Sequence, residues 1–447
     1  MSRYTELLQR LEAHLARGDW RALLLETTNT VIALFQDPLA KAVVYGSPEL
    51  DRLCLQAGKL VWDAKPAAPD RTFDAATSVF VATELYKGVG GHTLALKDLM
   101  TAQPGLRHVV LITNLHNRQL QPEQIFEDMQ PRPDVRVAPD GDLGLKVLWL
   151  HEQLLSLSAG RLTLFNHHYD TAAIACAQPG AAASTVYFHH CDHDMALGLY
   201  LPHALHVDCS NLMHDKCTHT LGVHNPRHWP IVAPDHGARD PDAPFMADGS
   251  LTTAAHGSIA KFLAAGRHSY FDVIHRRLKE LGGVHLHIGG LPEATLAEFA
   301  QRLAADDIDP SRFRNVPPVP SLWKYLAASP IDVCISSFPI QGLKGLVETM
   351  GAGLPILIQQ STLSRNHSSR DLVYEEALTW RHPDDFMAAL RQVTPAGLAA
   401  HSRAARRHYE RWHHPRELAY TLASPALHVA PPPMHDFQQD TLALYWR

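Results

Sequence analysis

The residues with the clearest chemical potential lie between positions 332 and 355. A short apolar run ends in small polar residues, a glycine-bearing turn follows at 342–345, and a predicted helix then carries Glu348 in its second turn. The first turn of such a helix presents backbone N–H groups without intrahelical partners and a partial positive charge, which together favour an anion by about 0.3–1 kcal/mol. The carboxylate can accept hydrogen bonds from a neighbouring pair of hydroxyls. The segment is therefore predicted to hold an anionic ligand that also carries hydroxyl groups.

The segment resembles the donor-nucleotide motif of GT-B glycosyltransferases. The likeness covers the whole arrangement from Asp332 to the Gly-Leu-Pro sequence that ends at Pro355. It implies that Glu348 accepts hydrogen bonds from the ribose of a nucleotide diphosphate sugar, and that the glycines let the main chain approach the diphosphate. The residues expected to bind the donor in this segment are Ser337, Pro339, Gly342, Leu343, Lys344, Gly345 and Glu348.

One position departs from a common form of this motif. Many retaining members of the class carry a second acid eight residues before the equivalent of Glu348, where this chain has Ile340. The Ser-Phe-Pro sequence that ends at Pro339 resembles the inverting or peptide-modifying O-GlcNAc-transferase/HMW1C-like group at least as well. The resemblance therefore leaves open a GT4-like or an O-GlcNAc-transferase-like relationship, and with it the stereochemistry of the transfer.

A cation is expected where the second domain begins. The sequence His256-Gly-Ser-Ile-Ala-Lys261 stands where GT-B enzymes place a glycine turn and a positive charge on the nucleotide diphosphate. A fixed ammonium stabilises the departing diphosphate more in the transition state than in the ground state, as catalysis requires. The resemblance implies that Lys261 is this catalytic group and that the main chain of Gly257 and Ser258 assists it. The alternative is a solvated lysine in a first helical turn.

A glycine-rich turn, Gly88-Val-Gly-Gly-His-Thr93, lies between the first strand and the first helix predicted for the first domain. It does not match the dinucleotide fingerprint G-x-G-x-x-G, because position 93 is threonine, so a Rossmann dehydrogenase is disfavoured. It resembles the GT-B loop that approaches the diphosphate and the acceptor, which implies donor contact by Gly91 and an acceptor-side place for Thr93. His92 is a candidate general base, since an unperturbed histidine pKa of about 6.5 suits the task. The alternative is a partly exposed histidine at a helix start.

A dense group of histidine, cysteine and aspartate residues after another predicted strand invites interpretation as a metal site. The group is His189-His-Cys-Asp-His-Asp194, and Cys209, His214, Cys217 and His219 could complete it. Adjacent residues of one strand point to opposite faces, so these side chains cannot all converge on one ion, and no metal ligand is assigned. The segment resembles acceptor-side loops of some bacterial GT-B enzymes. This implies that His190 and His193 lie on the acceptor side, with Asp192 as an alternative base to His92.

The length and composition of the chain indicate the number of domains and the class of protein. A chain of 447 residues predicts two domains, and its net charge of −6 with interspersed signs offers no basic surface for nucleic acid. No apolar run approaches the roughly 20 residues that a bilayer span requires. The six cysteines are scattered without a C-x-x-C pair, which favours reduced thiols and a cytoplasmic location.

The periodicity of apolar residues predicts helices first, then alternating strands and helices. Leucines recur at helical spacing in residues 4–36, and alternation begins at Thr77. The proline-rich stretch 225–250 is the best candidate linker. The predicted fold class is α/β, with two Rossmann-like doubly wound domains of the GT-B type facing a cleft. The expected divisions are 1–70 for an N-terminal helical extension, 71–240 for the acceptor-side domain, 241–425 for the nucleotide-sugar-binding domain and 426–447 for a C-terminal tail.

The resemblance implies a glycosyltransferase that moves a sugar from a nucleotide diphosphate sugar to a protein or glycan acceptor. It further implies that no cofactor and no obligatory divalent metal is needed. Two alternatives belong to other classes. One is a non-catalytic protein that binds nucleotide sugars or glycans on the same fold, and the other is a metallohydrolase that uses the histidines and cysteines of residues 189–219.

Overall fold

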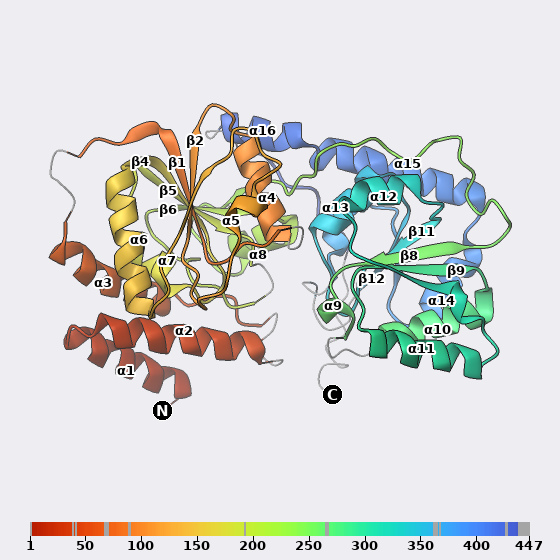
Figure 1. Ribbon diagram of the computed structural model, residues 1–447, viewed down its shortest axis with the longest axis horizontal. Helices are drawn as coiled ribbons and strands as arrows, with labels where there is room; N and C mark the ends of the chain where they lie inside the picture. The colour runs from red at the N-terminus through yellow and green to blue at the C-terminus, as the bar shows by residue number, and fades with distance from the viewer. Residues whose placement is uncertain are drawn as a thin grey trace. The chain divides into compact units, whose positions relative to one another are not determined.

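The computed structural model describes residues 2–37, 40, 43–66, 71–87, 91–191, 194–263, 268–360, 365, 368–424 and 428–436. The chain divides into two compact α/β units, each built around one sheet (Figure 1). Unit 1 comprises Met1–Trp229 with Thr421–Ala430, and unit 2 comprises Pro230–Tyr420 with Pro431–Arg447. The units therefore part at Trp229, whereas the sequence placed the division between residues 240 and 241.

Within the described residues of unit 1, seven parallel strands form a sheet in the order β3-β2-β1-β4-β5-β6-β7. Its central strands are apolar and buried, as expected for parallel strands covered by helices on both faces. Strand order reverses between β1 and β4. The strands are β1 (Asp74–Ala82), β2 (Arg107–Ile112), β3 (Asp134–Val137), β4 (Ala159–Phe165), β5 (Ser184–His189), β6 (Ala204–Asp208) and β7 (Arg227–His228). The helices among them are α4 (Gly91–Thr101), α5 (Pro122–Ile125), α6 (Leu143–Leu157), α7 (Thr171–Cys176) and α8 (Asn211–His219).

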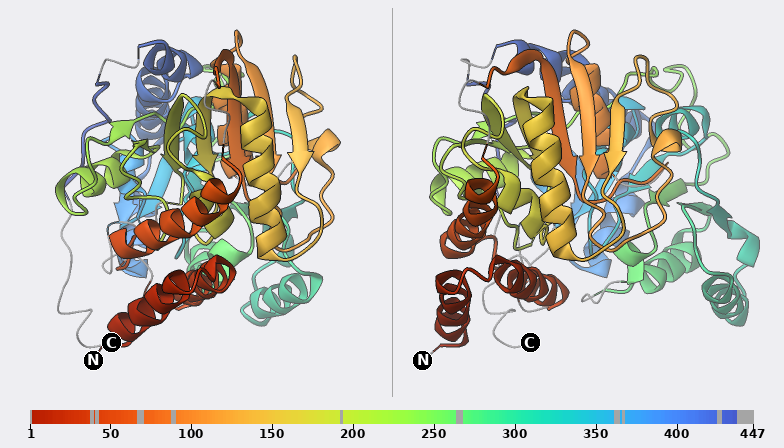
Figure 2. Two further views of the ribbon diagram at one scale, coloured as in Figure 1. Left: turned by 90° about the vertical axis from the view of Figure 1, so that its left-hand side faces the viewer. Right: turned by 60° about the vertical axis from the view of Figure 1, so that its left-hand side comes forward.

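Three helices precede this sheet and belong to the same unit: α1 (Arg3–Ala16), α2 (Trp20–Gln36) and α3 (Pro48–Ala64). Each begins with a capping side chain that accepts a hydrogen bond from a backbone N–H of the first turn, which satisfies one of the otherwise unpaired donors. Helices α2 and α3 pack against α6 and α7, and Figure 2 shows them in red beside the yellow α6. A β-carbon on Gly58 would lie 1.8 Å from the carbonyl oxygen of Ala175, so α3 and α7 touch backbone to backbone. The helical extension is thus packed onto unit 1.

Within the described residues of unit 2, six parallel strands form a sheet in the order β10-β9-β8-β11-β12-β13. Strand order reverses between β8 and β11, as it does between β1 and β4 in unit 1. The strands are β8 (Thr252–His256), β9 (Val284–Ile288), β10 (Phe313–Val316), β11 (Val333–Ile335), β12 (Ile356–Gln359) and β13 (Leu378–Trp380). The helices are α9 (Ala260–Leu263), α10 (Tyr270–Leu281), α11 (Glu293–Ala305), α12 (Leu322–Ala328), α13 (Lys344–Gly351), α14 (Pro383–Gln392), α15 (Pro395–Trp412) and α16 (Pro415–Ala423), whose residues 421–423 belong to unit 1.

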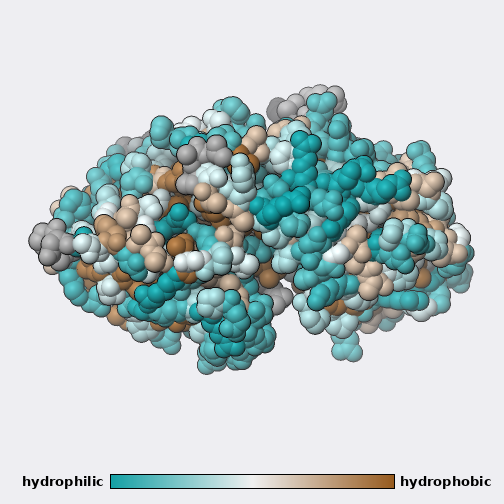
Figure 3. All heavy atoms as spheres, turned by 90° about the horizontal axis from the view of Figure 1, so that it is seen from above, coloured by the Kyte–Doolittle hydropathy of each residue, from teal (hydrophilic) through white to brown (hydrophobic). Residues whose placement is uncertain are grey.

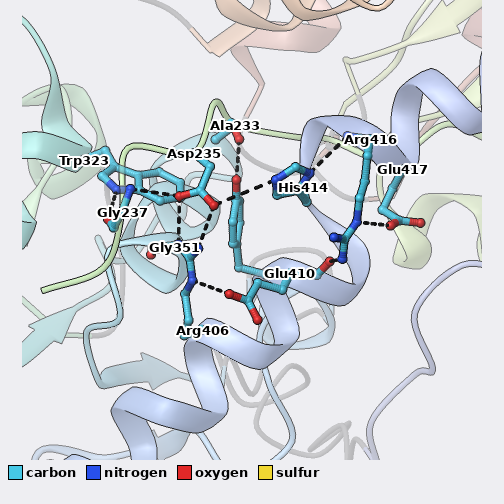
Figure 4. Close-up of polar contacts among 11 residues, drawn as sticks. Ala233, Asp235, Gly237, Trp323, Gly351, Arg406, Glu410, His414, Arg416 and Glu417 are labelled. Carbon is cyan, nitrogen blue, oxygen red and sulfur yellow. Dashed lines mark hydrogen bonds and ion pairs between the residues drawn. The ribbon is translucent and has the colours of Figure 1, made fainter. Parts of the chain in front are cut away.

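The first residues of unit 2 are fixed to its own helix α15, although the sequence placed them in the candidate linker. Asp235 accepts hydrogen bonds from Arg406 at 3.0 and 2.6 Å, and the Tyr409 hydroxyl donates to the Ala233 carbonyl at 2.8 Å (Figure 4). The indole of Trp323 donates to the Gly237 carbonyl at 2.6 Å. The prolines of this stretch therefore belong to an extended segment packed against unit 2, at least as far as Gly237.

Among the residues that the structure describes, no helix is both long enough and apolar enough to cross a membrane. The face drawn in Figure 3 is mainly hydrophilic, and its apolar residues are scattered. Scattered apolar residues of this kind are normal on protein surfaces and do not by themselves mark a binding site.

Candidate functional site

Both sheets place the predicted site residues where strand order reverses. In open parallel sheets, ligands bind beyond the carboxyl ends of the strands at this switch point. In unit 1 the switch lies between β1 and β4, and His92 follows β1. In unit 2 it lies between β8 and β11; Lys261 follows β8, and Gly342 follows β11. Each unit therefore contains a candidate site of its own.

In unit 2 the side chain of Lys261 lies directly over the main chain of Gly342. A β-carbon added to Gly342 would stand 2.5 Å from the Lys261 Nζ, so any side chain at this position would displace the ammonium. The Ile340 N–H also donates to the Lys261 carbonyl at 3.4 Å, which joins the loop after β11 to helix α9. Burial lowers the pKa of Lys261, because water stabilises the ammonium less here than in solution. The sequence-predicted cation and glycine turn are thus brought together.

The glycine turn leads into helix α13, whose first turn is open among the described residues. No side chain of that part of the chain caps Leu343, the N-cap residue. The Lys344 ammonium is buried and donates to the Val232 carbonyl. Lys344 can therefore bind an anion through its backbone N–H and not through its side chain. Glu348, one turn later, is partly exposed, whereas Val347 and Thr349 on either side of it are buried.

His256 supports this turn from the end of β8 and was not selected from the sequence. The hydroxyl of Thr349 donates to the Gly345 carbonyl at 2.8 Å, so it accepts the N–H of His256 Nε2, 2.9 Å away. Burial and the nearby positive charge of Lys261 lower the pKa of His256 to about 4, which keeps the ring neutral at pH 7. A β-carbon on Gly345 would come within 2.5 Å of the ring. The glycine therefore lets a neutral imidazole pack against the start of α13.

The other residues predicted to bind the donor nucleotide lie around the Lys261–Gly342 contact. Gly257 has φ +144° and packs beside the Lys261 side chain, and its carbonyl would lie 2.4 Å from a β-carbon on Gly289. Ser258 is exposed, and its carbonyl accepts the Lys261 N–H at 3.0 Å. Ser337 is buried at the end of β11, and Pro339 follows a cis peptide bond and is partly exposed.

In unit 1 the predicted His92 and His190 meet a third histidine that the sequence did not reveal. The rings of His92 and His190 are stacked with centroids 6.0 Å apart, and the ring of His167, which follows β4, lies edge-on to His92 at 5.1 Å. Burial lowers the pKa of all three, to about 3 for His167 and well below the usual value for His190. The cluster therefore consists of neutral imidazoles at pH 7.

Beside this cluster lies the buried carboxylate of Glu84, with its side chain 3% exposed. Its Oε2 accepts from the Tyr86 hydroxyl and lies 3.2 Å from Arg118 Nε, whereas its Oε1 has no hydrogen-bond partner in the described part of the chain. Burial and this hydrogen bond raise the pKa of Tyr86 to about 12. The carbonyl of Glu84 accepts the N–H of His92 Nε2 at 3.2 Å. The switch point of unit 1 thus combines clustered histidines with an anchored carboxylate.

Two other predicted residues, Thr93 and Gly91, do not enlarge this cluster. Thr93 is buried and accepts the Tyr86 N–H at 3.2 Å, so its hydroxyl secures the preceding turn. Gly91 is exposed and begins α4. Asp192 and His193 lie outside the described residues.

The histidine-rich segment after β5 divides between the two faces of the sheet, as strand alternation requires. His190 faces His92, while His189 faces Asp208, whose Oδ1 lies 2.9 Å from His189 Nδ1. Of the further residues considered as ligands, Cys217 lies near Asp208, Cys209 directs its sulfur to the His189 carbonyl, and His219 is exposed. His189 and His190 therefore do not belong to one ligand set.

Comparison with known proteins finds solved structures with a similar architecture. No protein-family model matches the chain, and no curated protein sequence matches it significantly. HepE of Anabaena, solved with UDP and glucose, superposes with a TM-score of 0.55 at 12% identity over 78% of this chain and 99% of HepE. TarM gives a TM-score of 0.58 at 8% identity over 79% of this chain and 99% of TarM. A Thermobaculum terrenum O-GlcNAc transferase variant gives 0.52 at 13% identity over 94% of this chain and 83% of the transferase.

This chain has the GT-B fold. The predicted class of two Rossmann-like α/β domains is confirmed, since the sheets of seven and six strands match those neighbours. At identities of 8–13% the likeness establishes the fold and not the activity. Within the GT-B fold, the Lys261–Gly342 contact and the open start of α13 lie in the C-terminal Rossmann-like unit.

The superposition on the O-GlcNAc transferase reaches further along the chain than the one on HepE. The 6% that it leaves out amounts to about 27 of the 447 residues, fewer than the residues in helices α1, α2 and α3 together. The alignment must therefore include part of these N-terminal helices.

Proposed function

We propose that this protein transfers a sugar from a nucleotide diphosphate sugar to a protein or glycan acceptor, without a divalent metal in the transfer step. The observation that carries the proposal is the Lys261 ammonium held against the main chain of Gly342, next to the open first turn of α13. The neighbours WaaG and WaaB, which have the same fold, are glycosyltransferases, and HepE is solved with UDP and glucose, which supports a donor of this class.

Unit 2 is assigned the donor. The Lys261 ammonium and the first backbone N–H groups of α13 bind the diphosphate, and Glu348 accepts hydrogen bonds from the ribose. As the bond between sugar and diphosphate breaks, negative charge accumulates on the leaving group. A partly desolvated ammonium stabilises that charge strongly, because little water screens it. The bound diphosphate in turn favours the charged form of Lys261, which burial alone disfavours.

Unit 1 is assigned the acceptor, with His92 as the base. The Glu84 carbonyl can only accept a hydrogen bond, so His92 Nε2 carries the proton and Nδ1 keeps a free lone pair. The other two clustered histidines are poor bases at pH 7, because burial lowers the pKa of His167 to about 3 and that of His190 well below its usual value. The acceptor hydroxyl or amide gives its proton to Nδ1 as it attacks the sugar. Asp192 stays the alternative base.

A protein acceptor is supported by one further observation. The O-GlcNAc transferase superposition includes part of the N-terminal helices, and these helices pack onto the acceptor-side unit. Helices packed on this unit provide a surface that can bind a polypeptide acceptor outside the side chain that receives the sugar. A glycan acceptor is the alternative, and the neighbour WaaG is a glycosyltransferase involved in lipopolysaccharide biosynthesis.

Binding and turnover of donors test the proposal and separate an enzyme from a non-catalytic binder. The full chain is melted with UDP-, GDP-, ADP- and dTDP-sugars, and a donor at 100 times its Kd should add about 2.7 kcal/mol to the free energy of unfolding. Release of the nucleoside diphosphate is then followed with the stabilising donor. Stabilisation with release supports the enzyme, and stabilisation without release under any acceptor condition supports the binder. The absence of stabilisation by every donor would contradict both.

A further inference from the structure

Unit 1 contains a second set of polar side chains that the proposed transfer does not use. They are His189 at the end of β5, His206 and Asp208 on β6, and Cys217 on α8. All four are buried, with exposed fractions between 0 and 3%. One potential ligand atom from each lies within 4.8 Å of those from the others. Three consecutive elements, β5, β6 and α8, thus bring these side chains to one point in the interior.

Four distances between ligand atoms of this cluster are close to those of a tetrahedral metal site. Asp208 Oδ1 lies 2.9 Å from His189 Nδ1, 2.9 Å from His206 Nε2 and 3.3 Å from Cys217 Sγ. Cys217 Sγ lies 3.8 Å from His189 Nδ1. Zinc–ligand bonds of about 2.0–2.3 Å place tetrahedral ligand atoms roughly 3.3–3.8 Å apart. Lengthening the two nitrogen–oxygen contacts of Asp208 by about 0.4 Å would bring them to the separation that zinc ligands require.

The hydrogen bonds of the cluster also leave one oxygen unused. Two imidazole N–H groups and the Cys217 thiol all point at Asp208 Oδ1, whereas Oδ2, equally buried, has no hydrogen-bond partner among the described residues. A carboxylate offers about four acceptor positions on its two oxygens, so a hydrogen-bonding role would be expected to use both. His214 Nδ1, at 3.6 Å from Oδ2, is too distant for a good hydrogen bond.

We propose that His189, His206, Asp208 and Cys217 bind one zinc ion that stabilises unit 1. The donor set of two imidazoles, one carboxylate and one thiolate suits zinc, whereas magnesium and calcium prefer oxygen ligands alone. Four protein ligands fill a tetrahedral shell and leave no position for a substrate water, as in structural zinc sites. The site is therefore structural, which separates it from a metallohydrolase centre and from the sugar transfer.

Zinc binding to this cluster has a definite proton balance. The Cys217 thiol loses its proton to solvent and binds as thiolate, while Asp208 is already a carboxylate. Each histidine binds through the nitrogen that now faces Asp208, and its proton moves to the other ring nitrogen. Bound zinc then joins β5, β6 and α8, and its binding energy adds to the folding energy of unit 1.

Metal analysis with matched cysteine variants tests the site. The full chain is prepared with zinc and exchanged into metal-free buffer, and a second sample is loaded with cobalt. We expect about one zinc per chain, and in the cobalt form the thiolate-to-cobalt charge transfer and visible bands of a tetrahedral site. Cys217→Ser should abolish the charge-transfer band and weaken zinc binding by at least about 100-fold. Cys209→Ser, at a buried thiol that points elsewhere, should retain both.

Three outcomes would overturn the proposal: a wild-type chain that binds no zinc, a cobalt form without the thiolate band, or a Cys217→Ser variant that binds zinc as the wild type does. The first two need no variant and hold even if Cys217→Ser fails to fold. Chelation of the zinc should lower the Tm of the wild type. Because the site is independent of the donor site, nucleotide-sugar binding by unit 2 can fail or succeed without changing this result.

Discussion

Lys261 and Gly342 form a pair in which the ammonium of one occupies the space that any side chain of the other would need, since a β-carbon on Gly342 would stand 2.5 Å from Nζ. The residues come from the loops after β8 and β11, the two strands at the switch point of unit 2. A glycine at 342 therefore determines where the charge of Lys261 is held.

Gly342→Ala should lower the transfer rate by roughly 10- to 100-fold, because it moves the ammonium from its position over the main chain. The clash is with the flexible end of a lysine side chain, so the free energy of unfolding should change by only about 0.5 kcal/mol. Gly290→Ala is the matched control, since its β-carbon meets nothing within 4 Å. Initial rates and urea unfolding of both variants check this. Equal rates for the two variants would show that the position of the ammonium is unimportant.

Gly351→Ala should lower the free energy of unfolding. Its β-carbon would lie 1.8 Å from the Trp323 ring, which is buried, packs edge-on to Tyr409 and donates to the Gly237 carbonyl. Overpacking of this kind costs about 1–3 kcal/mol or more, because an anchored indole cannot move aside easily. Urea unfolding should show the loss of stability, and Gly290→Ala again serves for comparison. A variant as stable as the wild type would mean that α12 and α13 separate readily.

Arg406 should contribute to the stability of unit 2 through the contacts in Figure 4. Its guanidinium binds Asp235, Glu410 and the Gly351 carbonyl, with the side chain 20% exposed. Arg406→Met should cost about 1–3 kcal/mol, since it leaves these acceptors without a donor. Arg411→Met, on an exposed position of the same helix, should cost less than about 0.5 kcal/mol. Similar losses in the two variants would contradict a special role for Arg406.

Acid should destabilise the protein well above the titration range of its carboxylates. Burial lowers the pKa of several histidines, to about 3 for His167 and His408 and to about 4 for His256, His287 and His413. Below pH 6.5 these histidines bind protons in the unfolded chain but not in the folded protein. The stability that is present above pH 6.5 is therefore lost as the pH falls toward 4. Each ring contributes on the order of 1 kcal/mol per pH unit. Urea midpoints at pH 7.5, 6 and 5 measure this, and midpoints independent of pH would contradict neutral buried rings.

Much of the fold follows from the apolar pattern, and the parts that do not have physical reasons. The continuous apolar run 109–113 and the alternating run 284–288 predict strands, and β2 (Arg107–Ile112) and β9 (Val284–Ile288) lie close to these bounds. β6 and β13 were not predicted: in β6 a buried histidine, His206, interrupts the apolar pattern, and β13 is only three residues long. The prolines near Ala233 indicated a linker, yet they suit an extended segment bound to a helix equally well.

The candidate sites were predictable where a motif spans neighbouring residues, and unpredictable where the fold brings distant residues together. Lys261 and the glycine turn came from local patterns. His167 belongs to no motif and joins His92 only because β1 and β4 are neighbours in the sheet. The cluster around Asp208 likewise depends on the pairing of β5 with β6, which the spacing of histidines and cysteines along the chain does not reveal.

The donor role of Lys261 is the central claim, and single-turnover release of nucleoside diphosphate by Lys261→Ala tests it most directly. Lys324→Ala, which removes an exposed lysine of α12, is the matched control, and unfolding curves establish that both variants are folded. The account predicts a rate at least about 100-fold below wild type for Lys261→Ala, with the control unchanged. A folded Lys261→Ala variant that releases the diphosphate at the wild-type rate would contradict it.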